Sequence, residues 1–152
     1  MKKTIKLILV ILCMIFIFSF SSDNAQKSTK KSDSVIIKIS ETIFKRKLTE
    51  KEKEYYTSKY IVIVRKSAHF TIYLILGFLI SSLLKEYMII NKKNIIMTII
   101  IIAIYACSDE IHQLFIPGRS GEIRDVLIDT LGGFTGSIFY RIYFKIRRKN
   151  IN

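Results

Sequence analysis

A short apolar run over residues 95–107 is followed directly by acidic residues and a histidine, and this arrangement limits how the chain can fold. At 1.5 Å per residue, these 13 residues would cover roughly 20 Å as a helix, short of a hydrocarbon core of about 30 Å. A helix that crosses a membrane here must continue to about residue 116, where Pro117 and Gly118 provide a turn signal. We therefore predict a span over residues 95–116 whose outer end carries Asp109, Glu110 and His112.

Three further apolar stretches predict that the chain is a polytopic membrane protein. Half of its 152 residues are hydrophobic and the mean hydropathy is +0.31, which is high for a soluble domain of this size. The other spans are predicted at about residues 4–20, 61–84 and 126–144. The expected fold is all-α: one membrane domain over residues 1–152, with about four transmembrane helices in a bundle and one extracytoplasmic amphipathic helix.

The segment between the first two predicted spans divides into two parts. Residues 21–34 are polar, which predicts a flexible linker. Residues 35–59 are predicted to be an extracytoplasmic helical segment, because apolar residues from Val35 to Phe44 recur at three- and four-residue spacing. That amphipathic helix would lie on the bilayer surface or pack on the outer mouth of the protein itself. Thr49 and Glu52 fit a capping box, which predicts the start of a short second helix.

The positive charge of the chain fits a membrane surface better than a nucleic acid. Lys and Arg number 25 against 12 acidic residues, giving a formal net charge of +13, but they lie between and beyond the apolar stretches and form no nucleic-acid-binding motif. The basic start, the turn with Lys85, Lys92 and Lys93, and the basic tail all lie in the cytoplasm if the N-terminus does. We expect a multi-pass protein of the cytoplasmic membrane with cytoplasmic N- and C-termini. The first helix is expected to be retained, with cleavage as a signal peptide as the alternative.

In this topology, polar residues at the outer ends of three spans reach a similar depth. Charged groups inside a membrane cost several kcal/mol unless they are paired or hydrated, so they are expected to face the interior of the bundle and to mark a functional site. The residues concerned are Arg65, Lys66, His69, Asp109, Glu110, His112, Gln113, Arg119, Asp125 and Asp129.

These residue types indicate two kinds of chemistry. The catalytic candidates are a base and an acid that orients it, chosen from His69, Asp109, Glu110 and His112. The ligand-binding candidates are Arg65, Lys66, Gln113, Arg119, Asp125 and Asp129, since guanidinium and ammonium groups bind phosphate or carboxylate. Two alternatives remain open: a structural network in which the acids pair with the basic residues, and a metal held by both histidines and a carboxylate. The prediction names no metal site, and the cofactor is left unknown.

Three motifs carry a resemblance to a known family. They are R-K-x-x-H-F-x-x-Y-x-x-L-G from Arg65, Y-A-x-x-D-E-x-H-Q-x-F-x-P-G-R from Tyr105, and D-V-x-x-D-x-x-G from Asp125. In residues 65–136 the chain resembles the VanZ-like family of bacterial integral membrane proteins, which is named for a protein associated with low-level resistance to the glycopeptide teicoplanin. The resemblance implies a polytopic protein of the bacterial cell envelope and draws attention to the polar residues named above.

Two functional hypotheses follow, and they belong to different classes. The first is a cell-envelope protein that binds an anionic membrane lipid or a lipid-linked cell-wall precursor in an outward-facing polar pocket and so modulates teicoplanin susceptibility. The second is an intramembrane hydrolase or transferase that acts on such a lipid. A transporter or a small scaffold is a third hypothesis, which the position of the charges near one face disfavours. The sequence leaves the enzymatic nature and the oligomeric state undetermined.

Overall fold

Five α-helices make up almost all of the described chain. The structure, a computed structural model, describes residues 2–149, and these contain no β-strand. The helices are α1 (Lys2–Ser21), α2 (Ala25–Phe44), α3 (Glu50–Leu84), α4 (Lys92–Gln113) and α5 (Ile123–Lys149). This confirms the predicted all-α helical bundle.

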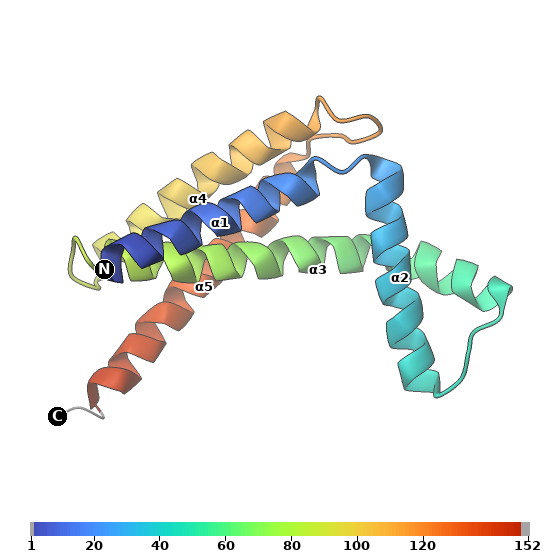
Figure 1. Cartoon of the computed structure of the whole chain (residues 1–152), viewed down its shortest axis with the longest axis horizontal. Helices are drawn as coiled ribbons and strands as arrows, with labels where there is room; N and C mark the ends of the chain where they lie inside the picture. The colour runs from blue at the N-terminus through green and yellow to red at the C-terminus, as the bar shows by residue number, and fades with distance from the viewer. Residues whose placement is uncertain (1, 150–152) are drawn as a thin grey trace.

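The long helix α3 lies at the centre of the arrangement (Figure 1). Helices α1 and α4 lie along its second half, α5 crosses it obliquely, and α2 stands at a steep angle against its first half. The start of α1 and the end of α5 lie at the same end of the molecule, as the predicted topology requires (Figure 1). Helix α2 and the first turns of α3 lie at the opposite end.

The predicted flexible linker over residues 21–34 is wrong, because α2 begins at Ala25 and is continuous to Phe44. Its start is fixed by Asn24, whose side chain accepts a hydrogen bond of 2.9 Å from the backbone N–H of Lys27. The buried residues Ser32, Ile36 and Ser40 follow each other at four-residue spacing, so they lie on one face of the helix. That face packs on α3, so the amphipathic helix is extended toward its N-terminus and lies on the protein itself.

Helix α3 begins at the predicted capping box but does not end where the prediction expected. The backbone N–H of Glu52 bonds to the hydroxyl of Thr49, and the backbone N–H of Thr49 bonds to the carboxylate of Glu52. The prediction of a separate short helix is wrong, since α3 continues for 35 residues from Glu50 to Leu84. The sequence has no Gly or Pro over residues 50–76 that would interrupt it.

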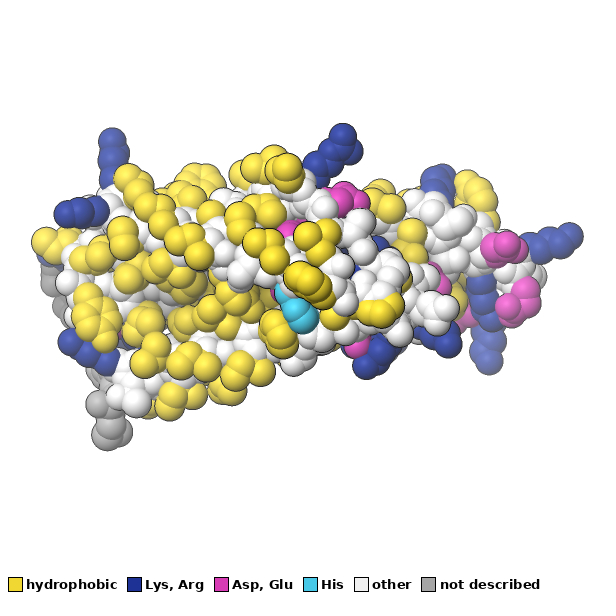
Figure 2. Space-filling view, turned by 90° about the horizontal axis from the view of Figure 1, so that it is seen from above, with side chains coloured by type: hydrophobic (Ala, Val, Ile, Leu, Met, Phe, Trp, Pro, Cys, Tyr) yellow, Lys and Arg dark blue, Asp and Glu magenta, His cyan; other side chains and the backbone are white. Residues whose placement is uncertain are grey.

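Three of the four predicted spans have the length and composition of membrane-crossing helices. These are α1, α3 and α4. Hydrophobic side chains cover the left half of the molecule as seen in Figure 2, and Lys and Arg lie at its left end and over its right half. The fourth stretch is also helical, within α5, but charged residues such as Asp129, Arg141 and Lys145 make its composition less apolar. Helix α4 ends at Gln113, three residues before the predicted limit of 116, because the chain already turns ahead of Pro117.

Glycines allow α3 and α5 to cross at backbone contact. A Cβ atom on Gly136 would lie 1.9 Å from the carbonyl oxygen of Leu74, and one on Gly132 would lie 2.4 Å from that of Phe70. Neither backbone oxygen is able to move without distorting its helix. The G-x-x-x-G spacing of Gly132 and Gly136 therefore brings α5 into close contact with α3.

We predict that Gly136→Ala separates α3 from α5 and lowers the free energy of unfolding by about 2 kcal/mol or more, because the added methyl group overlaps a backbone carbonyl. Thermal unfolding of the full chain in detergent measures this effect. Thr135→Ala is the control, since its hydroxyl bonds only to its own helix, at the carbonyl of Leu131. Equal stability of the two variants would contradict the crossing.

Candidate functional site

One histidine and two aspartates from three different helices meet inside the bundle. His69 comes from α3, Asp109 from α4 and Asp129 from α5, and each offers one potential ligand atom within 4.8 Å of the others. Asp129 is fully buried and Asp109 is 2% exposed. The Nδ1 atom of His69 lies 3.7 Å from Oδ1 of Asp129, a distance too long for a hydrogen bond. The glycine contacts between α3 and α5 place these two residues opposite each other.

Several polar atoms of this cluster have no hydrogen-bond partner among the described residues. They are Nδ1 of His69, Oδ1 of Asp109 and both carboxylate oxygens of Asp129. The hydroxyl of Tyr73, one helical turn after His69, is likewise buried and unpaired within residues 2–149. Buried polar groups in proteins are nearly always hydrogen-bonded, so an accumulation of unpaired atoms at one point marks a site for water, a proton, a ligand or an ion.

The other oxygen of Asp109 is held from two sides. The hydroxyl of Ser21, the last residue of α1, donates a hydrogen bond of 2.7 Å to Oδ2 of Asp109. The side-chain amide of Gln113 donates to the same oxygen at 3.4 Å and to Oε1 of Glu110 at 3.1 Å. Ser21 was not predicted as a site residue, because a serine at the end of an apolar stretch has no spacing relation to residues on other helices.

Arg119 joins the end of α4 to the junction between α1 and α2. Its guanidinium donates to Oε1 of Gln113 at 2.9 Å, to the carbonyl of Asp23 at 2.9 Å and to that of Phe20 at 3.3 Å. Residues 114–122 connect α4 to α5. Glu110 holds the end of this connection, because its Oε2 accepts a 2.9 Å hydrogen bond from the backbone N–H of Glu122. Gln113, Glu110 and Arg119 thus support the cluster around Asp109.

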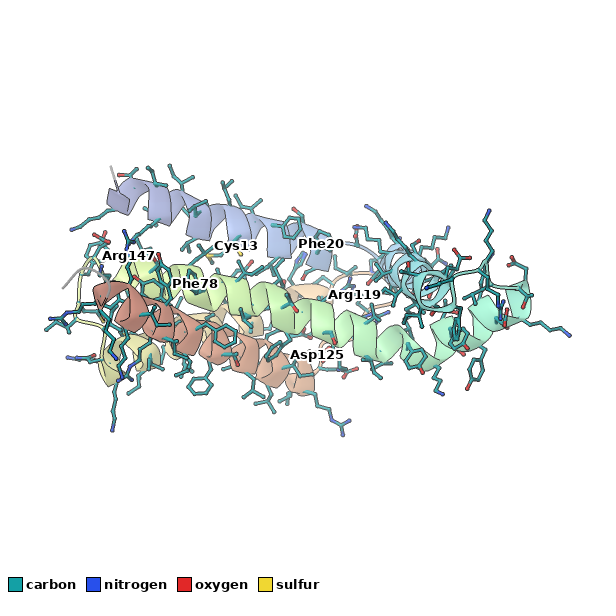
Figure 3. All side chains as sticks on the ribbon, turned by 90° about the horizontal axis from the view of Figure 1, so that it is seen from below. Cys13, Phe20, Phe78, Arg119, Asp125 and Arg147 are labelled. Atoms are coloured by element: carbon teal, nitrogen blue, oxygen red, sulfur yellow. The ribbon has the colours of Figure 1, made fainter. Side chains whose placement is uncertain are left out.

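Three predicted site residues lie apart from this cluster. His112 stacks on Phe18 with ring centroids 4.4 Å apart, and its Nε2 lies 3.2 Å from the hydroxyl of Ser22. Lys66 pairs with Asp125 and lies 3.6 Å from Glu122. In Figure 3, Asp125 and Arg119 lie on opposite sides of α3. Within residues 2–149, no group of possible metal ligands contains both histidines, so the predicted metal alternative is wrong, and the only ion pair of the predicted structural network is that of Asp125 with Lys66.

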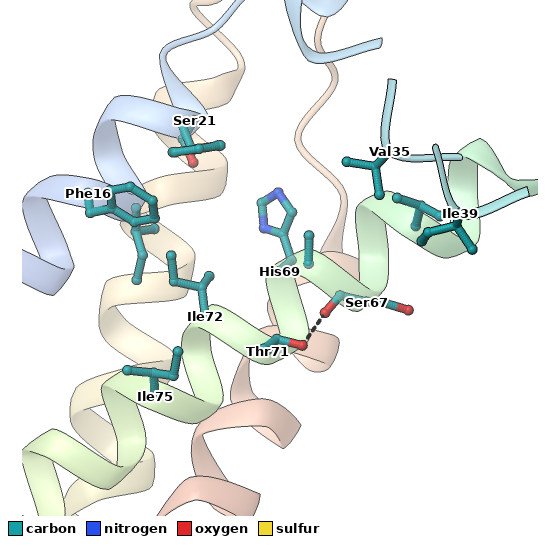
Figure 4. Close-up of a pocket in the computed structure, with 13 residues that line it drawn as sticks. Phe16, Ser21, Val35, Ile39, Ser67, His69, Thr71, Ile72 and Ile75 are labelled. Carbon is teal, nitrogen blue, oxygen red and sulfur yellow. Dashed lines mark hydrogen bonds between the residues drawn. The ribbon is translucent and has the colours of Figure 1, made fainter. Parts of the chain in front are cut away.

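Two adjoining cavities reach the cluster from outside. An apolar groove of about 560 Å³ lies between α1, α2 and α3, with Phe16, Ile39, Ile72 and Ile75 among its lining residues (Figure 4). A smaller cavity of about 200 Å³, called the basic cavity below, is lined by Lys31, Arg65 and Arg119 and by one acidic residue, Asp23. Five residues line both cavities, namely Phe20, Val35, Val64, Ala68 and His69. The sequence did not predict the groove, because its wall includes α2.

Comparison with known proteins identifies the family of the chain. A family model described as VanZ/LLP1 matches residues 6–144. The chain belongs to the VanZ family. No curated protein and no solved structure matches the chain. Each of the three sequence motifs supplies one member of the buried cluster: the first gives His69, the second Asp109 and the third Asp129.

An ion-pair network stabilises the α1–α2 junction of this VanZ-family chain and forms part of the wall of the basic cavity, which Asp23 and Lys31 both line. Asp23 pairs with Lys27 at 2.7 Å and also with Lys31. Hydrogen bonds from Lys27 and then Lys31 lower the pKa of the Asp23 carboxyl below its ordinary value. Because folding lowers this pKa, the stabilisation is complete above the unfolded-state pKa and is lost as the pH falls through the folded-state value.

We therefore predict that the thermal stability of the chain falls as the pH decreases from about 5 to about 2, and that Asp23→Asn reduces this dependence. Melting temperatures in detergent across this pH range test the prediction. Asp33→Asn is the matched control, since Asp33 forms no ion pair within the described part of the chain. An unchanged acid response in Asp23→Asn would contradict the assignment.

Proposed function

We propose that this VanZ-family protein binds an anionic amphiphile of the bacterial cell envelope, either a phospholipid or a lipid-linked cell-wall precursor. The observation that carries the proposal is the continuity of the apolar groove and the basic cavity through five shared residues. A hydrocarbon chain fits the groove between α1, α2 and α3, and a phosphate headgroup fits the neighbouring basic cavity. The apolar groove and the basic cavity thus match the hydrocarbon chain and the phosphate headgroup of a lipid.

Arg65 is the side chain best placed to bind the headgroup. Its Nε atom is buried without a partner among the described residues, and its Nη2 has only a long contact of 3.5 Å to the hydroxyl of Thr29. Arg119 supplies a second guanidinium, but its donors already hold the α1–α2 junction and Gln113. A guanidinium with free donors binds phosphate through paired hydrogen bonds.

The proposed location is the cytoplasmic membrane, with both termini in the cytoplasm and the polar cluster near the outer face. In that orientation α5 completes a fourth crossing, and the groove is open to lipids of the outer leaflet, where late cell-wall precursors are used. Sequestering such a lipid would change how much of it is exposed to teicoplanin. This is the link we propose between the pocket and glycopeptide susceptibility.

We predict that Arg65→Gln lowers retention of anionic lipid by roughly tenfold, because a hydrogen bond to a charged group contributes about 1.5–3 kcal/mol. The full chain is purified in mild detergent, and its bound lipids are quantified by mass spectrometry, with phosphatidylglycerol as the added probe. Arg124→Gln is the matched control, since it removes the same charge from an exposed position on α5. The proposal fails if the two variants retain equal amounts of phosphatidylglycerol. It also fails if the unaltered chain retains as much phosphatidylcholine as phosphatidylglycerol.

The second candidate function is an intramembrane hydrolase or transferase acting on the same lipid. It is favoured by His69, which lines both cavities and has Nδ1 at 3.7 Å from the carboxylate of Asp129, so a small side-chain movement would bring an orienting acid within hydrogen-bond reach. The same lipid analysis separates the two functions. A binding protein returns the added lipid intact, whereas an enzyme returns a chemically altered species.

A further inference from the structure

We propose that His69, Asp109 and Asp129 form a binding site for one divalent transition-metal cation. The three side chains come from α3, α4 and α5, and their ligand atoms lie within 4.8 Å of one another. This inference goes beyond lipid binding and does not depend on it, because two of the three ligands, Asp109 and Asp129, line neither the groove nor the basic cavity.

The first argument is the charge of the cluster. Asp109 and Asp129 are both buried, yet among the ion pairs of residues 2–149 none joins either carboxylate to a Lys or Arg. The nearest guanidinium network, that of Arg119, bonds to Gln113 and to backbone carbonyls. An uncompensated carboxylate in an apolar interior is strongly unfavourable, and two of them together more so. A divalent cation neutralises both at once.

The second argument is that the free atoms are those a metal requires. Nδ1 of His69, Oδ1 of Asp109 and both oxygens of Asp129 are buried and unpaired within the described chain. One imidazole nitrogen with carboxylate oxygens suits Zn²⁺ and similar transition metals better than Mg²⁺ or Ca²⁺, which prefer oxygen alone. Ligand atoms around a metal at about 2.1 Å stand roughly 3.4 Å apart in a tetrahedron, so small side-chain movements close the site.

The third argument is that the site has supporting contacts and a route of access. Ser21 and Gln113 donate to Oδ2 of Asp109, which leaves its Oδ1 directed elsewhere and fixes the orientation of the carboxylate. His69 also lines the apolar groove and the basic cavity, so the cluster is in contact with both. A cation at this point would lie beside the position proposed for a lipid phosphate.

The test measures metal bound to the purified full-length chain without a polyhistidine tag. The protein in detergent is stripped with a chelator, dialysed against Zn²⁺ and analysed for metal by mass spectrometry, with Mg²⁺ as the comparison ion. We expect about one Zn²⁺ per chain and a melting temperature that rises with added Zn²⁺, because a ligand that binds the folded state stabilises it. Absence of stoichiometric Zn²⁺ binding by the unaltered chain would overturn the proposal.

Variants identify the ligands. Asp129→Asn and His69→Ala should abolish Zn²⁺ binding, and Ser21→Ala should weaken it roughly tenfold, as expected for a contact that orients a ligand. His112→Ala is the matched control, since His112 lies against Phe18 and should leave binding unchanged. Equal loss in His112→Ala and His69→Ala would refute the assignment. If protons rather than a metal neutralise the cluster, Zn²⁺ has no effect and Asp129→Asn raises the melting temperature.

Discussion

The backbone contact between α3 and α5 is the constraint on which the rest of the molecule depends. Gly132 and Gly136 bring the two helices closer than any side chain would permit, at Phe70 and Leu74. Asp129 lies one turn before Gly132 on α5, and His69 lies beside Phe70 on α3, so the same crossing holds the imidazole against the carboxylate. The position of the site is therefore a direct result of helix packing.

The polar cluster also determines how the remaining helices assemble around this crossing. Asp109 is the residue that α4 contributes to the site. The hydroxyl of Ser21 donates a hydrogen bond to its carboxylate, and this bond holds the end of α1 beside α4. Arg119 then ties the α1–α2 junction to the end of α4, which places α2 against α3 and forms the wall of the groove. A helical bundle in lipid gains little from burying apolar side chains, so these hydrogen bonds and close contacts specify the arrangement.

Much of this could be predicted from the sequence, and the exceptions have identifiable physical reasons. Apolar length and helical spacing predicted the bundle and the common depth of His69, Asp109 and Asp129. They did not predict the direction of His112, because successive residues on a helix are about 100° apart and three-residue spacing leaves it displaced toward α1. They also missed the first half of α2, residues 25–34, whose polar composition hides the buried Ser32. Its stability comes from packing on α3, which local composition does not record.

The length of α3 has a consequence for how molecules reach the interior. Its 35 residues extend for about 52 Å, which is well beyond the roughly 30 Å that one crossing of a hydrocarbon layer requires, and α2 packs against its first half. Between α2 and α1, the apolar groove opens at the side of the molecule. A lipid of the kind proposed above would reach the groove by two-dimensional diffusion, and the relevant concentration would be its mole fraction in the leaflet rather than the amount in solution.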